Sequence, residues 1–495
     1  MMKAGWLGGV GTALIAGLAA ASPAQAAGGA QQCAGLTTNG LFTQTDVTSS
    51  QWRAADAVKG LPAHCEVMAT VSPVQGSNIG VVYRLPENWN GKLLGLGGGG
   101  WAGNVRPEAA AEGLTRGYAV AQTNAGHEGT NPWDTSWASN PEAVTDFQYR
   151  AIHLMTVTGK AVVQRYYGQT QKYTYYQGCS TGGRMGLMEA QRFPTDYDGI
   201  ITGAPVYSLQ VQTSSMLRNK AFAAPGASFT QEQLEMVRDA AVKACDAADG
   251  LKDNLIGNPR ACTWKPSALL CKPGQAASCL SPAQVTALNT AYNGIRAKDG
   301  QWAAFPMSRG GEAGWSLFIA TGNKPDATGG GGMVGLKPLL FGDKPLDPAT
   351  FDADRDVTTA RTSAFAKAYE ATDPDLREFV AHGGKLILWH GENDPGPSPV
   401  GTEDYYKKVS QAVPQASKSV RLFMAPGVEH CGGGPGADRP ETIAALEQWV
   451  EQGKPPETII ATRADGKLTR PLCAWPARAR YKGGDPNQPA SYSCK

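Results

Sequence analysis

Residues 172-KYTYYQGCSTGGRMGLMEAQRFPTDYDGIITGAP-205 carry the clearest structural signal in the chain. Residues 173–177 have the composition of a strand, residues 178–183 are small enough for a tight turn, and residues 184–192 have helical periodicity. A strand, a sharp turn and a helix around G-x-S-x-G form the context of a nucleophile elbow. The residues beside Ser180 must be small because a Cβ there would collide with the neighbouring strand or helix. The pattern predicts a serine hydroxyl held at a strand end, with a glycine-rich surface turn as the alternative.

Length and charge limit the class of protein. At 495 residues the chain is long enough for a large core and for two domains. Its hydrophobic content of 42% with 18% charged residues is ordinary for a globular protein and argues against extended disorder. The net charge is only +2 and no long basic run occurs, which argues against nucleic acid as a partner.

The N-terminal segment has the pattern of a secretory signal. Lys3 precedes an apolar run at residues 8–20 that is too short to span a bilayer, and Ala24-Gln25-Ala26 supplies small residues for cleavage. We therefore expect residues 1–26 to be a signal peptide, with a buried N-terminal helix as the alternative. No other stretch approaches the length of a membrane helix, so we expect a secreted or periplasmic protein without a membrane span.

An exported chain with ten cysteines is expected to form disulfides. Sequence alone does not fix their connectivity, but four pairs are suggested by proximity along the chain: Cys33–Cys65, Cys245–Cys262, Cys271–Cys279 and Cys473–Cys494. Cys179 and Cys431 are left over. They adjoin Ser180 and His430, so a bond between them would bring a serine to a histidine. The alternatives are two buried free thiols or pairing elsewhere.

Strand and helix patterns alternate over most of the chain, which predicts an α/β fold with a parallel sheet. The predicted strands are 65–71, 80–85, 92–96, 118–123, 173–177, 199–203, 385–389 and 420–424, and the predicted helices are 142–168, 184–192, 401–413 and 440–452. The alternation stops after residue 205, where only 231–247 and 281–297 look helical. We interpret residues 206–374 as a lid inserted into an α/β-hydrolase domain made of residues 27–205 and 375–495.

The order of residues in α/β hydrolases locates a catalytic triad: a nucleophile, an acid after a later strand, and a histidine after the last strand. His430 follows strand 420–424 and Asp394 follows strand 385–389, with Glu392 as the fallback acid. In this arrangement Asp394 would orient His430, which would take the proton from Ser180. Of the other histidines, His153 and His382 are expected to be packed or solvated, and His64 lies beside an expected disulfide. His127 and His390 lie in loops at strand ends and could face the site without being the base.

Three segments resemble the tannase and feruloyl esterase family, which also contains the bacterial hydrolase of mono(2-hydroxyethyl) terephthalate. They are GCSTGGRMGLMEAQRFPTDYDGIITGAP, LWHGENDPGPSP and APGVEHCGGGPGAD. The resemblance covers nearly all of the mature chain and is weakest at about residues 300–370. It implies an α/β-hydrolase fold and a Cys-Ser…Asp…His-Cys arrangement that matches Cys179, Ser180, Asp394, His430 and Cys431, with a disulfide between the two cysteines.

The resemblance also implies two further sites. One is an oxyanion hole made by the backbone amides of Thr181 and of Gly100 in the GGGGW run, which otherwise would be interpreted as a flexible linker. The other is a structural Ca²⁺ site in the lid, where a solvated Asp/Gly turn is the alternative. Its expected ligands are Asp246, Asp249, the Leu251 carbonyl, Asp253 and the Leu255 carbonyl. The loop is not an EF-hand, because Gly257 stands where that motif needs a glutamate.

These features predict a serine carboxylic-ester hydrolase that cleaves small aromatic esters through an acyl-serine, without a cofactor in the chemistry. Trp315 and Phe318 are expected either to stack on a phenolic ring or to form the lid core. Feruloyl and galloyl esters are not distinguished. Terephthalate monoesters are an alternative substrate class. Arg309 is a candidate for binding their carboxylate, but only because it lies near residues 322–336 in the sequence. A protease or lipase, and a binding protein on an inactive scaffold, are the rival classes. Nothing in the sequence indicates an oligomeric state.

Overall fold

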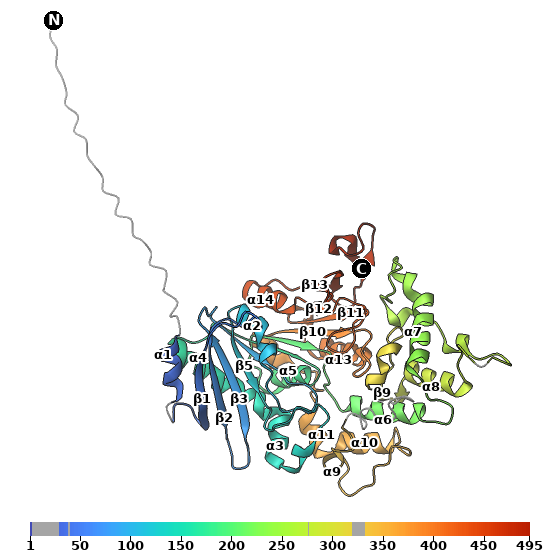
Figure 1. The fold of residues 1–495 in the computed structure, drawn as a ribbon, viewed down its shortest axis with the longest axis horizontal. Helices are drawn as coiled ribbons and strands as arrows, with labels where there is room; N and C mark the ends of the chain where they lie inside the picture. Colours follow the sequence, from blue (N-terminus) through green and yellow to red (C-terminus); the bar gives the residue numbers. More distant parts are fainter. Residues whose placement is uncertain (2–28, 38–39, 276, 319–331) are drawn as a thin grey trace.

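A central nine-stranded sheet organises the molecule (Figure 1). The computed structural model describes residue 1 and residues 29–37, 40–275, 277–318 and 332–495. The strand order is β1-β2-β3-β5-β4-β6-β7-β10-β11. The strands are β1 Thr45–Arg53, β2 His64–Val71, β3 Ile79–Pro86, β4 Lys92–Leu96, β5 Ala119–Thr123, β6 Tyr173–Cys179, β7 Gly199–Gly203, β10 Lys385–Gly391 and β11 Val420–Ala425.

The sheet is mixed, which corrects the expectation of a parallel sheet. Strands β5, β4, β6, β7, β10 and β11 are parallel, but β1, β2, β3 and β5 pair antiparallel in succession. Strand β1 was not predicted because its sequence, TDVTSSQWR, is polar and alternates between exposed and partly buried positions. It is an edge strand that is held by pairing with β2 rather than by an apolar run.

Helices cover both faces of the sheet, and neighbouring residues of one strand face opposite layers. One apolar cluster contains Tyr176 and Ile200 together with residues of α4 Ala151–Tyr167, α5 Thr181–Arg192 and α13 Pro399–Ala412. The other cluster contains Tyr175 and Ile201 together with residues of α2 Ala111–Thr115 and α14 Thr442–Gln452. The parallel strands are therefore buried on both sides, as in other α/β proteins.

The helix expected at residues 142–168 is divided into three parts. A short helix, α3 Pro141–Thr145, runs into a π-helical turn at Asp146–Arg150 and then into α4. Arg184 of α5 is fully buried and donates hydrogen bonds to the carbonyl oxygens of Phe147 (2.9 Å) and Gln148 (2.6 Å). Carbonyl groups of the π-helical turn thus accept hydrogen bonds from a side chain of α5, and these bonds connect the turn to α5.

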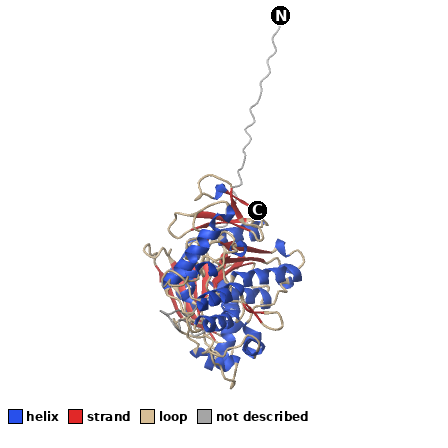
Figure 2. Cartoon of the chain, turned by 90° about the vertical axis from the view of Figure 1, so that its right-hand side faces the viewer, coloured by secondary structure: helices blue, strands red, loops and turns tan. Residues whose placement is uncertain are grey.

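The chain leaves the sheet after β7 and returns at β10, two strands that are adjacent and parallel. The intervening elements are α6 Gln210–Phe222, α7 Gln231–Cys245, α8 Pro282–Asn293, β8 Ile295–Arg296, β9 Trp302–Ala304, α9 Lys337–Leu340, α10 Arg355–Thr362, α11 Ala364–Tyr369 and α12 Arg377–Ala381. Helices of this segment lie in front of the sheet when the molecule is turned by 90° (Figure 2). The predicted helix 281–297 ends earlier, at Asn293, because Gly294 begins a small hairpin.

Two parts of this segment pack differently. Helices α6, α7 and α8 enclose an apolar cluster of their own around Phe222, Leu234 and Trp315. In contrast, Leu340, Val357 and Tyr369 belong to the main cluster on the sheet. The later half of the segment therefore packs on the sheet, as do Met216 and Leu217 of α6. We keep the name lid for the segment 206–374, whose boundaries as a domain stay a prediction.

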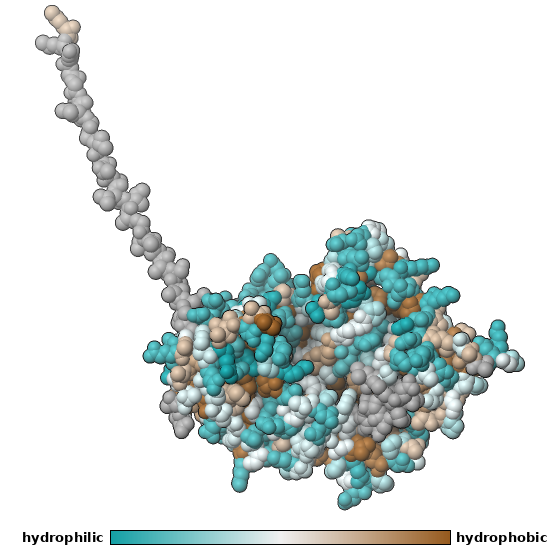
Figure 3. Space-filling view, in the orientation of Figure 1, coloured by the Kyte–Doolittle hydropathy of each residue, from teal (hydrophilic) through white to brown (hydrophobic). Residues whose placement is uncertain are grey.

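The C-terminal tail adds two small sheets that the sequence did not predict: β12 Arg439–Pro440, β13 Thr458–Thr462 and β14 Thr469–Cys473, and the pair β15 Ala479–Tyr481 and β16 Tyr492–Cys494. A short helix, α1 Ala30–Ala34, begins the described N-terminal part. The predicted signal peptide, residues 1–26, lies almost wholly outside the described residues. In the described part of the chain, no helix combines the length and apolarity that crossing a membrane requires. The face shown in Figure 3 is largely hydrophilic, with scattered apolar side chains.

All ten cysteines form disulfides, and each pairing is the one suggested by the sequence. The pairs are Cys33–Cys65, Cys179–Cys431, Cys245–Cys262, Cys271–Cys279 and Cys473–Cys494. Four of them close loops of 8 to 32 residues, but the pair Cys179–Cys431 joins segments 252 residues apart. This long-range bond connects the elbow to the loop after the last strand of the large sheet.

Candidate active site

Ser180 lies in the strained turn between β6 and α5. Its φ of 62° is in the left-handed region, which a non-glycine residue adopts only where its surroundings hold it there. Its N–H donates to the Gly203 carbonyl on β7 (2.9 Å). A Cβ on Gly182 would come within 2.7 Å of the Gly98 carbonyl oxygen, so the elbow and the glycine run are in direct backbone contact. Glycine is therefore needed at position 182 to hold the elbow against residues 97–100.

His430 and Asp394 are hydrogen bonded in line with Ser180. The Ser180 Oγ lies 2.8 Å from His430 Nε2, and His430 Nδ1 lies 2.6 Å from Asp394 Oδ2. With the Nδ1 proton donated to the carboxylate, Nε2 is the free acceptor for the serine proton. The three side chains predicted from their order in the chain are thus within hydrogen-bond distance of one another, although Ser180 and His430 are 250 residues apart.

Asp394 is buried and ionised. Burial by itself raises the pKa of this carboxyl group, but the charge of His430 and the hydrogen bond from His390 outweigh the burial, so the pKa lies below its ordinary value. The second oxygen, Oδ1, accepts the Gly396 N–H (2.8 Å). His390 is the penultimate residue of strand β10, and its Nε2 lies 3.1 Å from the same Oδ2 that binds His430. The sequence placed His390 at a strand end but gave no indication of this contact.

Glu392, the fallback acid, serves a different purpose. It is fully buried and pairs with two arginines, Arg260 from the lid segment and Arg478 from the tail (2.6 Å to the latter). Glu403 of α13 also binds Arg260 (2.5 Å). Burial by itself raises the pKa of Glu392, but the charges of Arg260 and Arg478 lower it below its ordinary value. The two arginines thus balance the negative charge of this buried carboxylate. We call these four residues the charge cluster; it joins lid, tail and β10 loop beside Asp394.

The remaining histidines have structural surroundings. His127 Nε2 lies 2.8 Å from the Trp101 carbonyl and its ring packs on Trp137, which supports the loop after the glycine run. His64 is buried beside the Cys33–Cys65 bond, and His382 ends helix α12 at the surface. His153 binds Asp196 (2.7 Å) and stacks on Phe193.

A cavity of about 440 Å³ opens at Ser180 and His430. Its walls include the glycine run, residues 97–100, so Gly100 faces the same space as the serine. Thr181 is the first residue of α5, and its N–H is one of those that lack an acceptor within the helix. Among the described residues that line the cavity, only Arg106 is a lysine, arginine, aspartate or glutamate, and its side chain is exposed.

The two aromatic candidates occupy different places. The Phe318 ring lies 5.5 Å from the His430 ring in an edge-to-face arrangement and 5.8 Å from Trp133, so it is next to the catalytic group. Trp315 is buried in the lid cluster against Phe222, which agrees with the alternative of a lid-core residue. Arg309 is also occupied within the lid: its Nε donates to the Trp264 carbonyl (2.8 Å). Most of the glycine-rich stretch 322–336, near which Arg309 was considered, lies outside the described residues.

The expected calcium ligands lie on one loop between α7 and Cys262. Asp246 accepts the N–H groups of Asp253 and Asn254, both at 3.1 Å, and Asp249 accepts the N–H of Leu251 (3.1 Å). Burial raises the pKa of Asp249, and the charges of Asp253 and Asp246 raise it further. The negative charges of these carboxylates repel one another, and a bound cation would relieve that repulsion. Arg470 already offsets part of the charge by pairing with Asp253 (2.7 Å).

A tighter cluster of potential metal ligands lies in the body of the hydrolase. In the described residues, one ligand atom each from His153, Glu189 and Asp196 lies within 4.8 Å of the others. Burial raises the pKa of Glu189 well above its ordinary value. Lys160 lies 3.9 Å from an Asp196 oxygen and supplies positive charge there.

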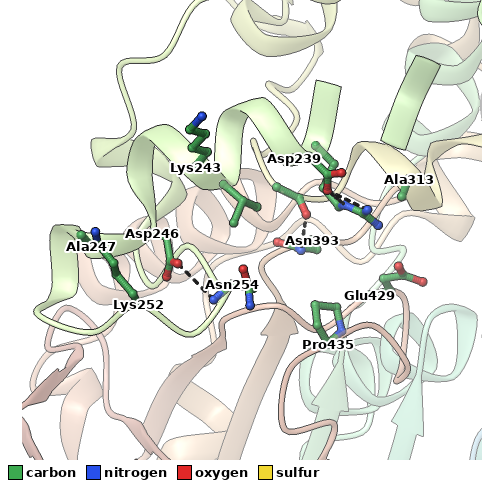
Figure 4. A pocket seen from close by; sticks show the side chains of 14 residues that line it. Asp239, Lys243, Asp246, Ala247, Lys252, Asn254, Ala313, Asn393, Glu429 and Pro435 are labelled. Atoms are coloured by element: carbon green, nitrogen blue, oxygen red, sulfur yellow. Dashed lines mark hydrogen bonds and ion pairs between the residues drawn. The ribbon is translucent and has the colours of Figure 1, made fainter. Parts of the chain in front are cut away.

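A second cavity, of about 700 Å³, separates the lid from the hydrolase loops. Figure 4 shows Asp239 and Lys243 of α7 on one side and Asn393, Glu429 and Pro435 on the other. Burial raises the pKa of Glu429, and the charge of Asp394 raises it further. The cavity is thus lined by Asn393 and Glu429, which precede Asp394 and His430 in the chain, but the side chains of Asp394 and His430 do not line it.

The mixed sheet, the strained serine at the end of β6 and the histidine after β11 define an α/β hydrolase. A family model described as tannase and feruloyl esterase matches residues 65–495. The chain therefore belongs to the tannase and feruloyl esterase family, and it is a carboxylic-ester hydrolase.

Individual relatives agree with this assignment. The chain is 33% identical to mono(2-hydroxyethyl) terephthalate hydrolase of Piscinibacter sakaiensis, over 91% of this chain and 88% of the relative. It is 34% identical to a probable feruloyl esterase of Arthroderma benhamiae, over 87% of this chain and 85% of the relative. The crystal structure of feruloyl esterase B from Aspergillus oryzae superposes with a TM-score of 0.83 at 28% identity, covering 94% of this chain and 100% of that one.

Proposed function

We propose that the protein is a serine esterase that cleaves esters of aromatic acids such as feruloyl or galloyl esters. The observation that carries the proposal is the hydrogen-bonded line from Ser180 through His430 to Asp394. Ser180 attacks the ester carbonyl while His430 takes its proton, and the alcohol leaves with that proton. Water, activated by the same imidazole, then attacks the acyl-serine and releases the acid. The negative charge of the tetrahedral intermediates would be bound by backbone N–H groups of Thr181 and Gly100.

The proposed aromatic preference rests on an aromatic side chain beside the base and on the names of relatives; Phe318 itself does not line the cavity at Ser180. Phe318 stands beside His430, and two of the relatives above are named for feruloyl esters. An aromatic acyl group would gain edge-to-face contacts there that an acetyl group lacks.

A panel of esters tests this proposal: methyl ferulate, methyl gallate, p-nitrophenyl acetate, tributyrin and casein, each with wild type and with Ser180→Ala. The proposal predicts a higher kcat/KM for methyl ferulate and methyl gallate than for tributyrin. It also predicts that Ser180→Ala abolishes turnover. Equal rates in both proteins would refute the nucleophile assignment and leave the inactive-scaffold alternative. Faster cleavage of casein or tributyrin would identify a protease or lipase instead.

Terephthalate monoesters are a second candidate substrate class, favoured by Arg106. No acidic side chain is among the described residues that line the cavity at Ser180, so a free carboxylate there would meet one cation and no anion. A relative at 33% identity is named for such a substrate. Comparing monomethyl with dimethyl terephthalate in wild type and Arg106→Gln separates the two classes. If the monoester is the substrate, Arg106→Gln raises KM for it alone; an equal change for both esters rejects this candidate.

We further propose that Ca²⁺ binds the lid loop through Asp246, Asp249, Asp253 and the carbonyls of Leu251 and Leu255. The repulsion among these carboxylates supports a cation there, whose role would be to hold the loop. Five disulfides support a location in an oxidising compartment, either secreted or periplasmic.

A further inference from the structure

The acid of the triad is bound by two imidazoles at one oxygen. Asp394 Oδ2 lies 2.6 Å from His430 Nδ1 and 3.1 Å from His390 Nε2. Both the His390 and the Asp394 side chains are fully buried, so water does not compete for the hydrogen bond between them. The triad mechanism requires the bond to His430, but it does not account for a second imidazole at the same atom.

The neighbours of His390 define which of its nitrogens carries the proton. Besides Asp394, Nε2 faces the carbonyl oxygen of Pro397 at 3.2 Å, and both neighbours are acceptors. The proton must therefore be on Nε2, because otherwise three acceptors would face one another in a buried space. On the other side, Nδ1 lies 2.8 Å from Thr402 Oγ1 of α13, whose hydroxyl can donate to it. Both ring nitrogens are then hydrogen bonded.

The charges around this pair come from several elements. Arg218 of α6 is buried next to Asp394, and its Nη2 donates to the Gly396 carbonyl (3.4 Å). Glu429 contributes negative charge from the loop that carries His430. Glu403, the residue after Thr402, is paired with Arg260. Among these groups only His390 and His430 touch Asp394 Oδ2, so His390 is the one that shares the oxygen used by the base.

We propose that His390 is a positioning residue for ester hydrolysis: its Nε2–H fixes the rotation of the Asp394 carboxylate and shares the charge on Oδ2 with His430. The carboxylate then has three fixed donors: His390 and the Gly396 N–H from β10 and the loop after it, and His430 from the loop after β11. Its Oδ2 keeps one direction, toward the Nδ1 of the base, through both proton transfers. This role rests on the proposed serine mechanism.

Three variants test the role of His390. His390→Leu removes the donor, His390→Gln places an amide N–H where Nε2 was, and His382→Leu is a matched control at an exposed imidazole. We expect His390→Leu to lower kcat for p-nitrophenyl acetate by about 10- to 100-fold with little change in KM, because a hydrogen bond to a charged group is lost. His390→Gln should recover most of that loss, and His382→Leu should behave as wild type.

The pH profile separates positioning from a general loss of structure. Without the second donor, Oδ2 binds the charged form of His430 more strongly, so the acid limb of kcat/KM should move to higher pH in His390→Leu and return in His390→Gln. The role of His390 is overturned if folded His390→Leu keeps kcat within about twofold of wild type and an unmoved acid limb. It is equally overturned if His390→Gln is as slow as His390→Leu.

A measurement on the unmutated protein covers the case in which His390→Leu does not fold. Histidine-selective ¹⁵N labelling reports the tautomer of each of the six imidazoles, with His390→Gln used only to assign the signal. The Nε2–H tautomer is expected for His390, and the Nδ1–H tautomer would overturn the proposal. This readout does not depend on turnover. An inactive wild type with the expected tautomer would therefore reject the serine-esterase proposal without bearing on the contact itself.

Discussion

Removing the Cys179–Cys431 disulfide should cost the protein both stability and catalysis. The bond closes a separation of 252 residues, whereas the lid bond Cys271–Cys279 closes only 8. In the chain-entropy model these separations correspond to about 5.5 and about 2.5 kcal/mol of stabilisation. The double variant Cys179→Ala/Cys431→Ala should therefore lose about 3 kcal/mol more unfolding free energy than Cys271→Ala/Cys279→Ala, measured by urea unfolding.

The catalytic effect follows from the positions of the two sulfurs. They belong to the residues next to Ser180 and His430, and Cys431 has a φ of 63° at the start of a glycine-rich turn. Without the bond this turn is free to relax, and a shift of about 1 Å in His430 costs on the order of 100-fold in rate. The lid double variant, in contrast, should keep the kcat of wild type for p-nitrophenyl acetate. Wild-type kcat in the site variant, together with equal losses of stability in both variants, would refute this reasoning.

Four other outcomes are expected. Gly182→Ala places a Cβ 2.7 Å from the Gly98 carbonyl oxygen and should lower kcat about tenfold or more by displacing residues 97–100, which include the proposed oxyanion donor Gly100. Gly35→Ala, where a Cβ has open space, should not change kcat, and equal rates in the two variants would contradict this reasoning. Burial raises the pKa of Glu312 to about 7. Its contribution to the unfolding free energy is therefore fully present below about pH 4.5 and is lost as the pH rises through 7. Urea unfolding of wild type should show this decline, and Glu312→Gln should lack it. Phe318→Leu should raise KM for methyl ferulate but not for p-nitrophenyl acetate, and parallel changes would place Phe318 outside the acyl site. EDTA should lower the melting temperature without abolishing turnover at room temperature, and an unchanged melting curve would exclude the calcium site.

The sequence predicted best those elements whose signal is local. Strand β7, Gly199–Gly203, is an apolar run, and the elbow at Ser180 is marked by a contiguous pattern of small residues between a strand and a helix. Strand β1 was missed because its polar sequence is ordered by pairing with β2, which no periodicity records. The antiparallel edge of the sheet was missed for the same reason.

The site shows the same division between local and distant information. The order of the chain was enough to select Ser180, Asp394 and His430, because fold topology places strand ends together. It could not show that Glu392 binds Arg260 and Arg478, which are 132 and 86 residues away. Nor could composition separate Trp315 in the lid core from Phe318 beside His430, since both are aromatic residues of one short segment.

The charge cluster has a consequence for exchanging lids between members of the family. A chimera that imports a foreign lid without an arginine in place of Arg260 would leave Glu392 short of one counter-ion, in a fully buried position two residues before Asp394. Trimming the tail before Arg478 would remove the other. A hybrid made to change substrate range should therefore exchange the tail together with the lid, even though the tail lies outside the lid in the sequence.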